Sequence, residues 1–152
     1  MRRAPTLLVI EDARDQAMLV GVAARRAHPG LDVRTVHDGA DGAAYLAGIA
    51  PFEDRTENPF PDLVILDLLM PHVDGFTLLR WMRKRFDGVD LPVVVLTSSA
   101  NPAHETRARA LGARAVYRKP DDLTDLGGVV REIIDTWIGS SVLIGAHIWA
   151  AG

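Results

Sequence analysis

The stretch Asp62-Leu63-Val64-Ile65-Leu66-Asp67 sets four consecutive apolar residues directly before an aspartate. The run Leu63–Leu66 is too short for a helix and does not alternate with polar residues. This pattern is typical of a strand that is buried on both faces of a parallel sheet. Three further runs share it: Leu7–Ile10, Val93–Leu96 and Ala113–Tyr117. A fifth candidate strand, Leu31–Val36, alternates more and is expected nearer an edge of the sheet.

Helical patterns separate these strands. The expected helices are Ala13–Arg26, Ala40–Ala50, Val73–Phe86, Pro102–Leu111 and Asp122–Ile138. The first carries an apolar stripe of Met18, Leu19, Val22 and Ala23, which would be its packed face. Because five strands alternate with five helices, we expect a doubly wound α/β domain with a parallel sheet.

The composition limits the class of protein. The chain has 152 residues and no cysteine, so it forms no disulfides. Its formal net charge of −3 gives no sign of a nucleic-acid binder. No stretch approaches the ~20 apolar residues of a membrane span, and the start does not read as a signal peptide, so we expect a cytoplasmic protein. Residues 5–138 form the expected domain, and residues 139–152 form a short apolar tail that leaves no room for an output domain.

Polar side chains stand where the predicted strands end. Glu11-Asp12 follow the first strand and Asp67 follows the third, while Thr97-Ser98-Ser99 and Lys119-Pro120 follow the fourth and fifth. The carboxyl ends of parallel strands lie at one edge of the sheet, where ligands bind in this class of fold. Three carboxylates, a hydroxyl and an ammonium are therefore expected to meet there.

Each of these residues also has an ordinary structural explanation. An aspartate after a strand is most often a helix cap or a turn former, and Lys-Pro after a strand is commonly part of a loop. Their joint placement at the ends of four strands favours a function. Three neighbouring carboxylates repel one another unless a cation joins them, and oxygen ligands suit Mg²⁺. A carboxylate beside Mg²⁺ and a lysine can accept a phosphoryl group.

At this point the sequence resembles the response regulator receiver domain of two-component signalling. The resemblance runs from about Thr6 to Ile138. The matching stretches are Leu8–Asp12, Pro61–Pro71, Asp74-Gly75, Val94–Ser98 and Lys119-Pro120. It implies a flavodoxin-like (βα)5 fold with strand order 2-1-3-4-5, and a protein that is not an enzyme. The implied function is a stand-alone regulator that a sensor histidine kinase phosphorylates and that signals through altered protein–protein contacts.

The resemblance also implies a role for each residue at the sheet edge. Asp67 would be the phosphoacceptor, and Thr97 and Lys119 would contact the phosphoryl group. Mg²⁺ would be bound by Asp12 directly, by Glu11 mainly through water, by Asp67 and by the backbone carbonyl of Leu69. The peptide bond between Lys119 and Pro120 would be cis.

A narrower resemblance points to the kinase. The long proline-rich loop before Leu63 and Trp137 near the end of the last helix resemble small single-domain regulators that are paired with phytochrome-type histidine kinases. The surface of the fourth helix, fifth strand and fifth helix is one that receiver domains use for dimers. We expect a homodimer there, to which Trp137 and the apolar tail segment Val142–Trp149 contribute.

Two positions depart from the usual family pattern. Three residues before the lysine, where the family has Tyr or Phe, this chain has Val116, and the aromatic Tyr117 comes one residue later. Successive strand residues face opposite sides, so Tyr117 cannot replace the missing ring. Leu69 and Ser99 occupy the positions that influence hydrolysis of the aspartyl phosphate. Because Leu69 cannot orient a water molecule by hydrogen bonding, we expect slow self-dephosphorylation.

Two rival functions use a similar framework. A phosphohydrolase of the haloacid-dehalogenase type would need a second aspartate two residues after Asp67, where this chain has Leu69. A flavodoxin-like cofactor binder would need a phosphate-binding loop after the first strand, where Glu11 and Asp12 would repel phosphate. Neither rival fits these residues as well as a receiver domain does.

Overall fold

The strands form a single parallel sheet in the order β2-β1-β3-β4-β5, in a computed structural model that describes residues 3–139. The strands are β1 (Thr6–Ile10), β2 (Asp32–Val36), β3 (Leu63–Leu66), β4 (Val93–Thr97) and β5 (Ala115–Arg118). The predicted doubly wound, flavodoxin-like fold and its strand order are therefore confirmed. The observed β5 begins two residues later than predicted, because Ala113 still bonds back to α4 through its amide, which donates to the carbonyl of Ala108 at 3.0 Å.

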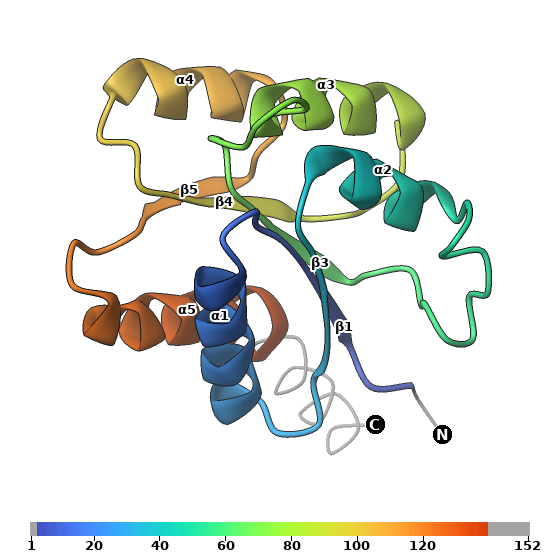
Figure 1. Cartoon of the computed structure of the whole chain (residues 1–152), viewed down its shortest axis with the longest axis horizontal. Helices are drawn as coiled ribbons and strands as arrows, with labels where there is room; N and C mark the ends of the chain where they lie inside the picture. The colour runs from blue at the N-terminus through green and yellow to red at the C-terminus, as the bar shows by residue number, and fades with distance from the viewer. Residues whose placement is uncertain (1–2, 140–152) are drawn as a thin grey trace, which may run out of the picture.

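Five α-helices cover the two faces of this sheet. They are α1 (Arg14–Ala27), α2 (Gly39–Ala47), α3 (Gly75–Arg85), α4 (Pro102–Ala110) and α5 (Leu126–Ile134). Figure 1 shows α1 and α5 below the sheet and α2, α3 and α4 above it. The predicted final helix Asp122–Ile138 is instead a 3₁₀ turn (η1, Leu123–Asp125), then α5, then a π-helical turn (η2, Asp135–Gly139). None of the helices described is long and apolar enough to cross a membrane.

The central strands are buried because both faces of the sheet are covered. Along β1, Leu7 and Val9 pack with α1 and α5, whereas Leu8 and Ile10 pack with the helices on the other face. Such alternation between two apolar layers explains why the central strands are almost entirely apolar in the sequence. The outermost strand β2 is only partly buried along most of its length.

Helix α1 packs through small side chains rather than through its large ones. Its buried residues are Ala17, Val20, Gly21 and Ala24. Met18, Leu19 and Val22 are 65%, 41% and 38% exposed. The predicted packed face is therefore wrong for these three residues. Small side chains at the contact allow a helix to approach its neighbours closely, and here this decides which face of α1 is buried.

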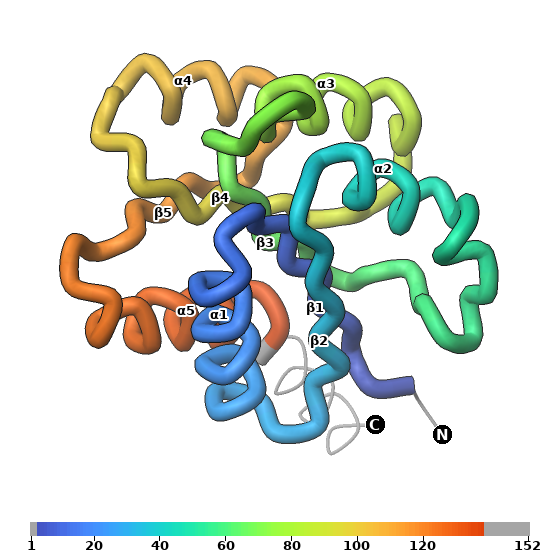
Figure 2. Tube along the Cα trace, in the orientation of Figure 1, coloured from blue at the N-terminus to red at the C-terminus, as the bar shows by residue number. Residues whose placement is uncertain are grey.

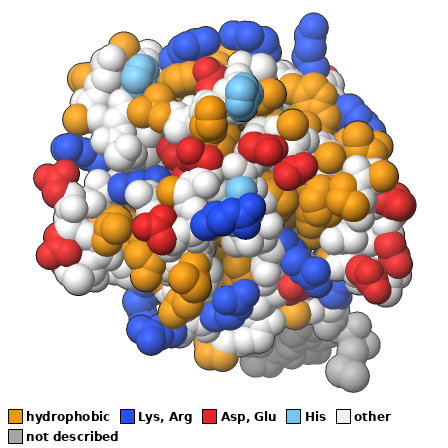
Figure 3. Space-filling model, in the orientation of Figure 1, with side chains coloured by type: hydrophobic (Ala, Val, Ile, Leu, Met, Phe, Trp, Pro, Cys, Tyr) orange, Lys and Arg blue, Asp and Glu red, His pale blue; other side chains and the backbone are white. Residues whose placement is uncertain are grey.

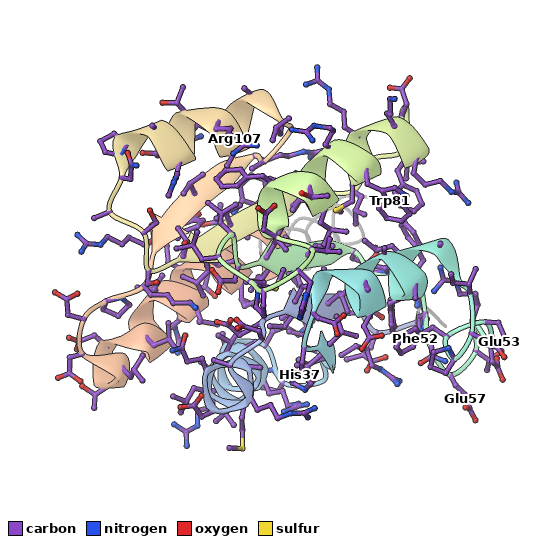
Figure 4. The ribbon with its side chains drawn as sticks, turned by 45° about the horizontal axis from the view of Figure 1, so that its top comes forward. His37, Phe52, Glu53, Glu57, Trp81 and Arg107 are labelled. Atoms are coloured by element: carbon purple, nitrogen blue, oxygen red, sulfur yellow. The ribbon has the colours of Figure 1, made fainter. Side chains whose placement is uncertain are left out.

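The long loop between α2 and β3 is held by one arginine. Figure 2 follows this segment outward from α2 and back to β3. The Arg55 guanidinium donates to the carbonyls of Tyr45 and Leu46, each at 2.7 Å, and to that of Asn58 at 3.1 Å. The Tyr45 hydroxyl donates to the carbonyl of Pro59 at 2.8 Å. The acidic side chains of Glu53 and Glu57 project outward from this loop (Figure 4).

The strand register aligns the residues that follow the strands. Ile10 of β1 is paired with Leu66 of β3, so Glu11 and Asp67 leave the sheet side by side. Thr97 of β4 is paired with Arg118 of β5, and the Lys119 amide donates to the Thr97 carbonyl at 2.8 Å. The carboxyl ends of β1, β3, β4 and β5 thus place the predicted site residues along one edge.

Candidate functional site

Three carboxylates meet at the ends of β1 and β3. One oxygen each of Glu11, Asp12 and Asp67 lies within 4.8 Å of the others. Glu11 and Asp67 are only 3% and 6% exposed, whereas Asp12 reaches solvent. Figure 3 shows acidic side chains gathered near the middle of this face, over the loops that follow these strands. We refer to Glu11, Asp12 and Asp67, together with Lys119, as the acidic pocket.

Lys119 closes the acidic pocket from the end of β5. Its side chain is buried, and its ammonium contacts the Glu11 carboxylate. The same nitrogen, Nζ, lies 2.7 Å from Oε1 of Gln16 and 3.5 Å from Oδ2 of Asp67. Because the Asp67 carboxylate and the ammonium lie so close, any group that is bound to Asp67 would be within reach of a positive charge.

The Glu11 carboxylate is buried beside a second negative charge, that of Asp67. Its burial, together with the negative charge of Asp67, raises its pKa from 4.5 to about 8, although the hydrogen bond from Lys119 acts in the opposite direction. Its second oxygen, Oε2, is buried and has no hydrogen-bond partner among the described residues. A divalent cation would satisfy that oxygen and offset the charge, so this oxygen-rich set fits the hard cation Mg²⁺.

The segment after Asp67 is shaped by a close approach of backbone to backbone. A Cβ atom at Gly75, the first residue of α3, would lie 2.5 Å from the carbonyl oxygen of Asp67 and 2.7 Å from Cα of Leu68. The Gly75 amide donates to the Leu68 carbonyl at 2.9 Å. Only glycine permits this contact, so Gly75 fixes where the loop that follows Asp67 can run.

Leu69 lies within this loop. Its amide lies 3.4 Å from Oδ1 of Asp67, and its side chain is 48% exposed. The apolar side chain therefore lies at the solvent boundary of the pocket. The role of its carbonyl as a metal ligand stays a prediction.

Thr97 is connected to α4 through Ser99. Thr97 is 2% exposed, and its hydroxyl accepts a hydrogen bond from the Ser99 amide at 3.2 Å. The Ser99 hydroxyl lies 2.6 Å from Nδ1 of His104 on α4. The His104 ring packs edge-on against Phe76 of α3 with 5.5 Å between ring centroids, and the Arg107 guanidinium lies 4.2 Å from the centre of the Phe76 ring (Figure 4).

Val116 and Tyr117 lie on opposite faces of β5, as the strand geometry predicts. Val116 packs into the apolar layer below α3 and α4, and Tyr117 packs into the layer beside α5. The Tyr117 hydroxyl accepts a hydrogen bond from the Trp137 indole at 3.2 Å. The aliphatic Val116 therefore occupies the position where an aromatic residue is usual. The Tyr117 hydroxyl instead contacts Trp137 of η2.

The expected cis bond between Lys119 and Pro120 is wrong. The cis peptide bond found in the described part of the chain precedes Pro51. The trans preference of a bond before proline is small, so the surrounding structure selects the isomer, and the sequence alone does not determine it.

The structure adds two polar residues that the sequence did not single out, Gln16 and His104. Both lie on helices rather than at strand ends. Gln16 is the third residue of α1, whereas Asp12 precedes this helix, so the helical i, i+4 spacing does not link the two residues. No local sequence pattern places Gln16 beside Lys119 or His104 beside Ser99.

Comparisons with known proteins identify the family to which the chain is similar. Residues 7–131 match the model of the response regulator receiver domain. Response regulator Rcp1 of Synechocystis sp. is 28% identical over 137 residues, which cover 90% of this chain and 91% of Rcp1. The chain spans only about half the length of some transcriptional regulators that it matches, such as RpaA of Synechocystis sp., which is 30% identical over 86% of this chain and 49% of RpaA.

Solved structures give the same result. The phosphorylated cyanobacterial phytochrome response regulator RcpA superposes with a TM-score of 0.83 at 26% identity, over 90% of this chain and 96% of RcpA. Response regulator RPA3017, which acts in red light signalling of R. palustris, has a TM-score of 0.79 at 33% identity over 88% and 94% of the two chains. The phosphohydrolase alternative finds no support. This chain belongs to the response regulator receiver domain family.

Proposed function

We propose that this chain is a response regulator whose Asp67 accepts a phosphoryl group from a sensor histidine kinase. The observation that carries the proposal is the acidic pocket itself, in which the buried Asp67 carboxylate lies 3.5 Å from the Lys119 ammonium and beside two further carboxylates. The phosphorylated state of RcpA, a similar structure, supports the same chemistry.

In the proposed reaction, an oxygen of Asp67 attacks the phosphorus of a phosphohistidine. The new P–O bond forms as the P–N bond breaks, and the departing imidazole nitrogen keeps the electron pair and takes up a proton. Bound Mg²⁺ would offset the charge on the transferring oxygens. Lys119 supplies a further positive charge 3.5 Å from Oδ2 of Asp67, and because its ammonium is buried and held by hydrogen bonds, little reorganisation is needed as the charge moves.

The proposed metal ligands are Asp12, Asp67 and the carbonyl of Leu69, with Glu11 acting mainly through water. Oε2 of Glu11 supports this assignment, because it is a buried acceptor that lacks a donor among the described residues. A solved structure of the similar regulator Rcp1 contains Mn²⁺, which shows that a divalent cation binds to a relative.

A phytochrome-type kinase is the proposed phosphoryl donor. RcpA and RPA3017 are described as acting in phytochrome or red light signalling. Both cover nearly the whole of this chain. We propose that residues 5–138 form the receiver and that it signals through protein contacts, including a homodimer across α4, β5 and α5. The tail segment of this proposed dimer lies outside the described residues. A monomeric sedimentation value with and without a phosphate mimic would contradict the dimer.

The aspartyl phosphate is proposed to be long-lived. Leu69 offers no hydrogen bond to water, and the Ser99 hydroxyl is already engaged with His104 at 2.6 Å. Neither residue is therefore free to orient an attacking water molecule. A half-life of only seconds in the isolated protein would contradict this part of the proposal.

The proposed function is tested by incubating the protein with acetyl phosphate and Mg²⁺ and measuring its intact mass. We expect one phosphoryl adduct on the wild type and none on Asp67→Asn. Asp87→Asn is a matched control, because Asp87 is an exposed aspartate after α3, and it should be phosphorylated like the wild type. An adduct of wild-type yield on Asp67→Asn would overturn the assignment.

A further inference from the structure

The ammonium of Lys119 has three acceptors for its three N–H donors. These acceptors are the Glu11 carboxylate, Oε1 of Gln16 at 2.7 Å and Oδ2 of Asp67 at 3.5 Å. Lys119 and Glu11 are almost completely buried, so an unpaired N–H in this place would be costly. Two of the three acceptors belong to the proposed phosphorylation chemistry, and Gln16 does not.

An uncharged acceptor suits this position for electrostatic reasons. The pocket already holds three carboxylates against one lysine. A fourth carboxylate would increase the repulsion and would compete with the phosphoryl group for Lys119. The Gln16 amide oxygen pairs with the ammonium while leaving the charge unchanged.

The distances from Nζ of Lys119 to its acceptors indicate that Gln16 helps to hold the ammonium in place. A lysine ammonium sits on a flexible stem of four carbons and is not oriented by its own shape. Nζ is 0.8 Å nearer to Gln16 than to Asp67, from 2.7 and 3.5 Å. The contacts to Glu11 and Gln16 therefore hold the ammonium, and its third N–H is left for the Asp67 side of the pocket.

We propose that Gln16 is a positioning residue for phosphoryl transfer, which holds the Lys119 ammonium so that one N–H is directed at the group on Asp67. The inference rests on the proposed function. During the reaction a phosphoryl oxygen replaces Oδ2 of Asp67 as the third acceptor, while Glu11 and Gln16 keep their places. The lysine then needs no large movement to reach the transferred group.

Loss of the acceptor at Gln16 is expected to alter the affinity for beryllofluoride but not the affinity for Mg²⁺. Gln16→Met keeps the length of the side chain and removes the acceptor. We expect the affinity for beryllofluoride, a mimic of the phosphoryl group, and the rate of phosphorylation by acetyl phosphate to fall about tenfold, the effect of one lost hydrogen bond to a charged group. The affinity for Mg²⁺ alone should stay close to that of the wild type, because Gln16 is not a metal ligand.

Two further variants complete the experiment. Leu19→Met introduces the same residue at an exposed position of α1 and should behave as the wild type. Gln16→Glu keeps an acceptor but adds a negative charge, so its Mg²⁺ affinity should rise while its beryllofluoride affinity falls. This second variant tests the inference even if Gln16→Met folds poorly.

The outcomes separate the inference from the proposed function. If the wild type binds no beryllofluoride in the presence of Mg²⁺, the proposed function fails. If the wild type binds it and both Gln16 variants bind it equally well, the inference is overturned while the proposed function stands. A parallel loss of Mg²⁺ and beryllofluoride affinity in Gln16→Met would also overturn the inference, because that result indicates general disruption of the pocket.

Discussion

Two neighbouring regions of the molecule are held together by different kinds of contact. In the acidic pocket, buried charged groups contact one another directly, as Lys119 does with Glu11 and Asp67. On the α4 side, defined by Thr97, Ser99, His104 and Val116, the contacts are made by hydrogen bonds without a carboxylate and by ring packing. Both regions lie at the carboxyl edge of the sheet, where Asp67 follows β3 and Thr97 ends β4.

In the proposed function, the two regions would have different tasks. A reaction at Asp67 needs charges at fixed positions, because electrostatic stabilisation depends steeply on distance in a buried site. Transmission of a conformational change needs only a connected set of packed side chains. The chain from Thr97 through Ser99 to His104 offers such a connection without the usual aromatic ring at Val116. Variants that alter one region while the other is observed would show whether the two are independent.

The largest effect is expected from Lys119→Met, which removes the positive charge of the pocket. The rate of phosphorylation by acetyl phosphate should fall by about 10²- to 10³-fold, as for the loss of one preorganised electrostatic contact. The structure of the α4 side, followed by amide hydrogen exchange, should not change. Unaltered phosphorylation kinetics in this variant would show that the charge of Lys119 is not used.

The next largest effect is expected from Gly75→Ala, at a position where two backbone segments approach closely. Gly75→Ala introduces a Cβ only 2.5 Å from the Asp67 carbonyl oxygen, so it should lower the free energy of unfolding by about 1–3 kcal/mol and weaken Mg²⁺ binding through displacement of Asp67. Urea denaturation and a Mg²⁺ titration measure the two effects.

Gly127→Ala provides the matched control for Gly75→Ala. A Cβ at Gly127 in α5 has no neighbour within 4 Å, so this variant should gain about 0.5–1 kcal/mol of stability, as usual for Gly→Ala in a helix. Equal stabilities of the two variants would contradict the close packing around Asp67.

The pH dependence of Mg²⁺ binding tests the charge state of the pocket. Burial raises the pKa of Glu11 to about 8 in the metal-free protein, and Mg²⁺ favours the ionised form. The apparent Mg²⁺ affinity should therefore rise with pH, by at most about tenfold per unit, and level off above pH 8. The raised pKa also means that Glu11 destabilises the metal-free fold increasingly as pH rises from 4.5 to about 8.

Calorimetric titrations at several pH values measure this dependence. Glu11→Gln is the control, and its Mg²⁺ affinity should vary much less over the same range. A wild-type affinity that does not change between pH 6 and 8 would be inconsistent with a raised pKa of Glu11.

The smallest effect is expected from Ser99→Ala on the α4 side. The variant loses the contact between the Ser99 hydroxyl and His104 at 2.6 Å, which should cost about 0.5–1.5 kcal/mol of stability. Phosphorylation by acetyl phosphate should stay close to the wild-type rate, while the response of α4 to beryllofluoride in amide hydrogen exchange should weaken. A strong fall in phosphorylation rate would show that the two regions are not separable.

The comparison also explains which features could be predicted from the sequence. The strands β1, β3 and β4 are continuous apolar runs with a polar residue at the end, so both their burial and the residues of the acidic pocket follow from a local pattern. The strand register then brings Glu11 and Asp67 together. The placement of side chains at strand ends can therefore be predicted without a structure.

Features that depend on helix packing were not predicted in the same way. The apolar residues Met18 and Leu19 are exposed while Ala17 and Ala24 are buried, because the fit between helices, and not hydrophobicity alone, selects the packed face. Gln16 contacts Lys119, which lies 103 residues away in the sequence, and no local sequence pattern predicts this contact. The isomer of the Lys119–Pro120 bond likewise depends on its surroundings.

Chemical trapping tests most directly whether Asp67 carries the phosphoryl group. After incubation with acetyl phosphate and Mg²⁺, sodium borohydride reduces an acyl phosphate to the alcohol and converts the modified aspartate to homoserine. Peptide mass spectrometry should find homoserine at position 67 and unchanged aspartate at position 12. Homoserine at any other carboxylate, with Asp67 intact, would contradict the account.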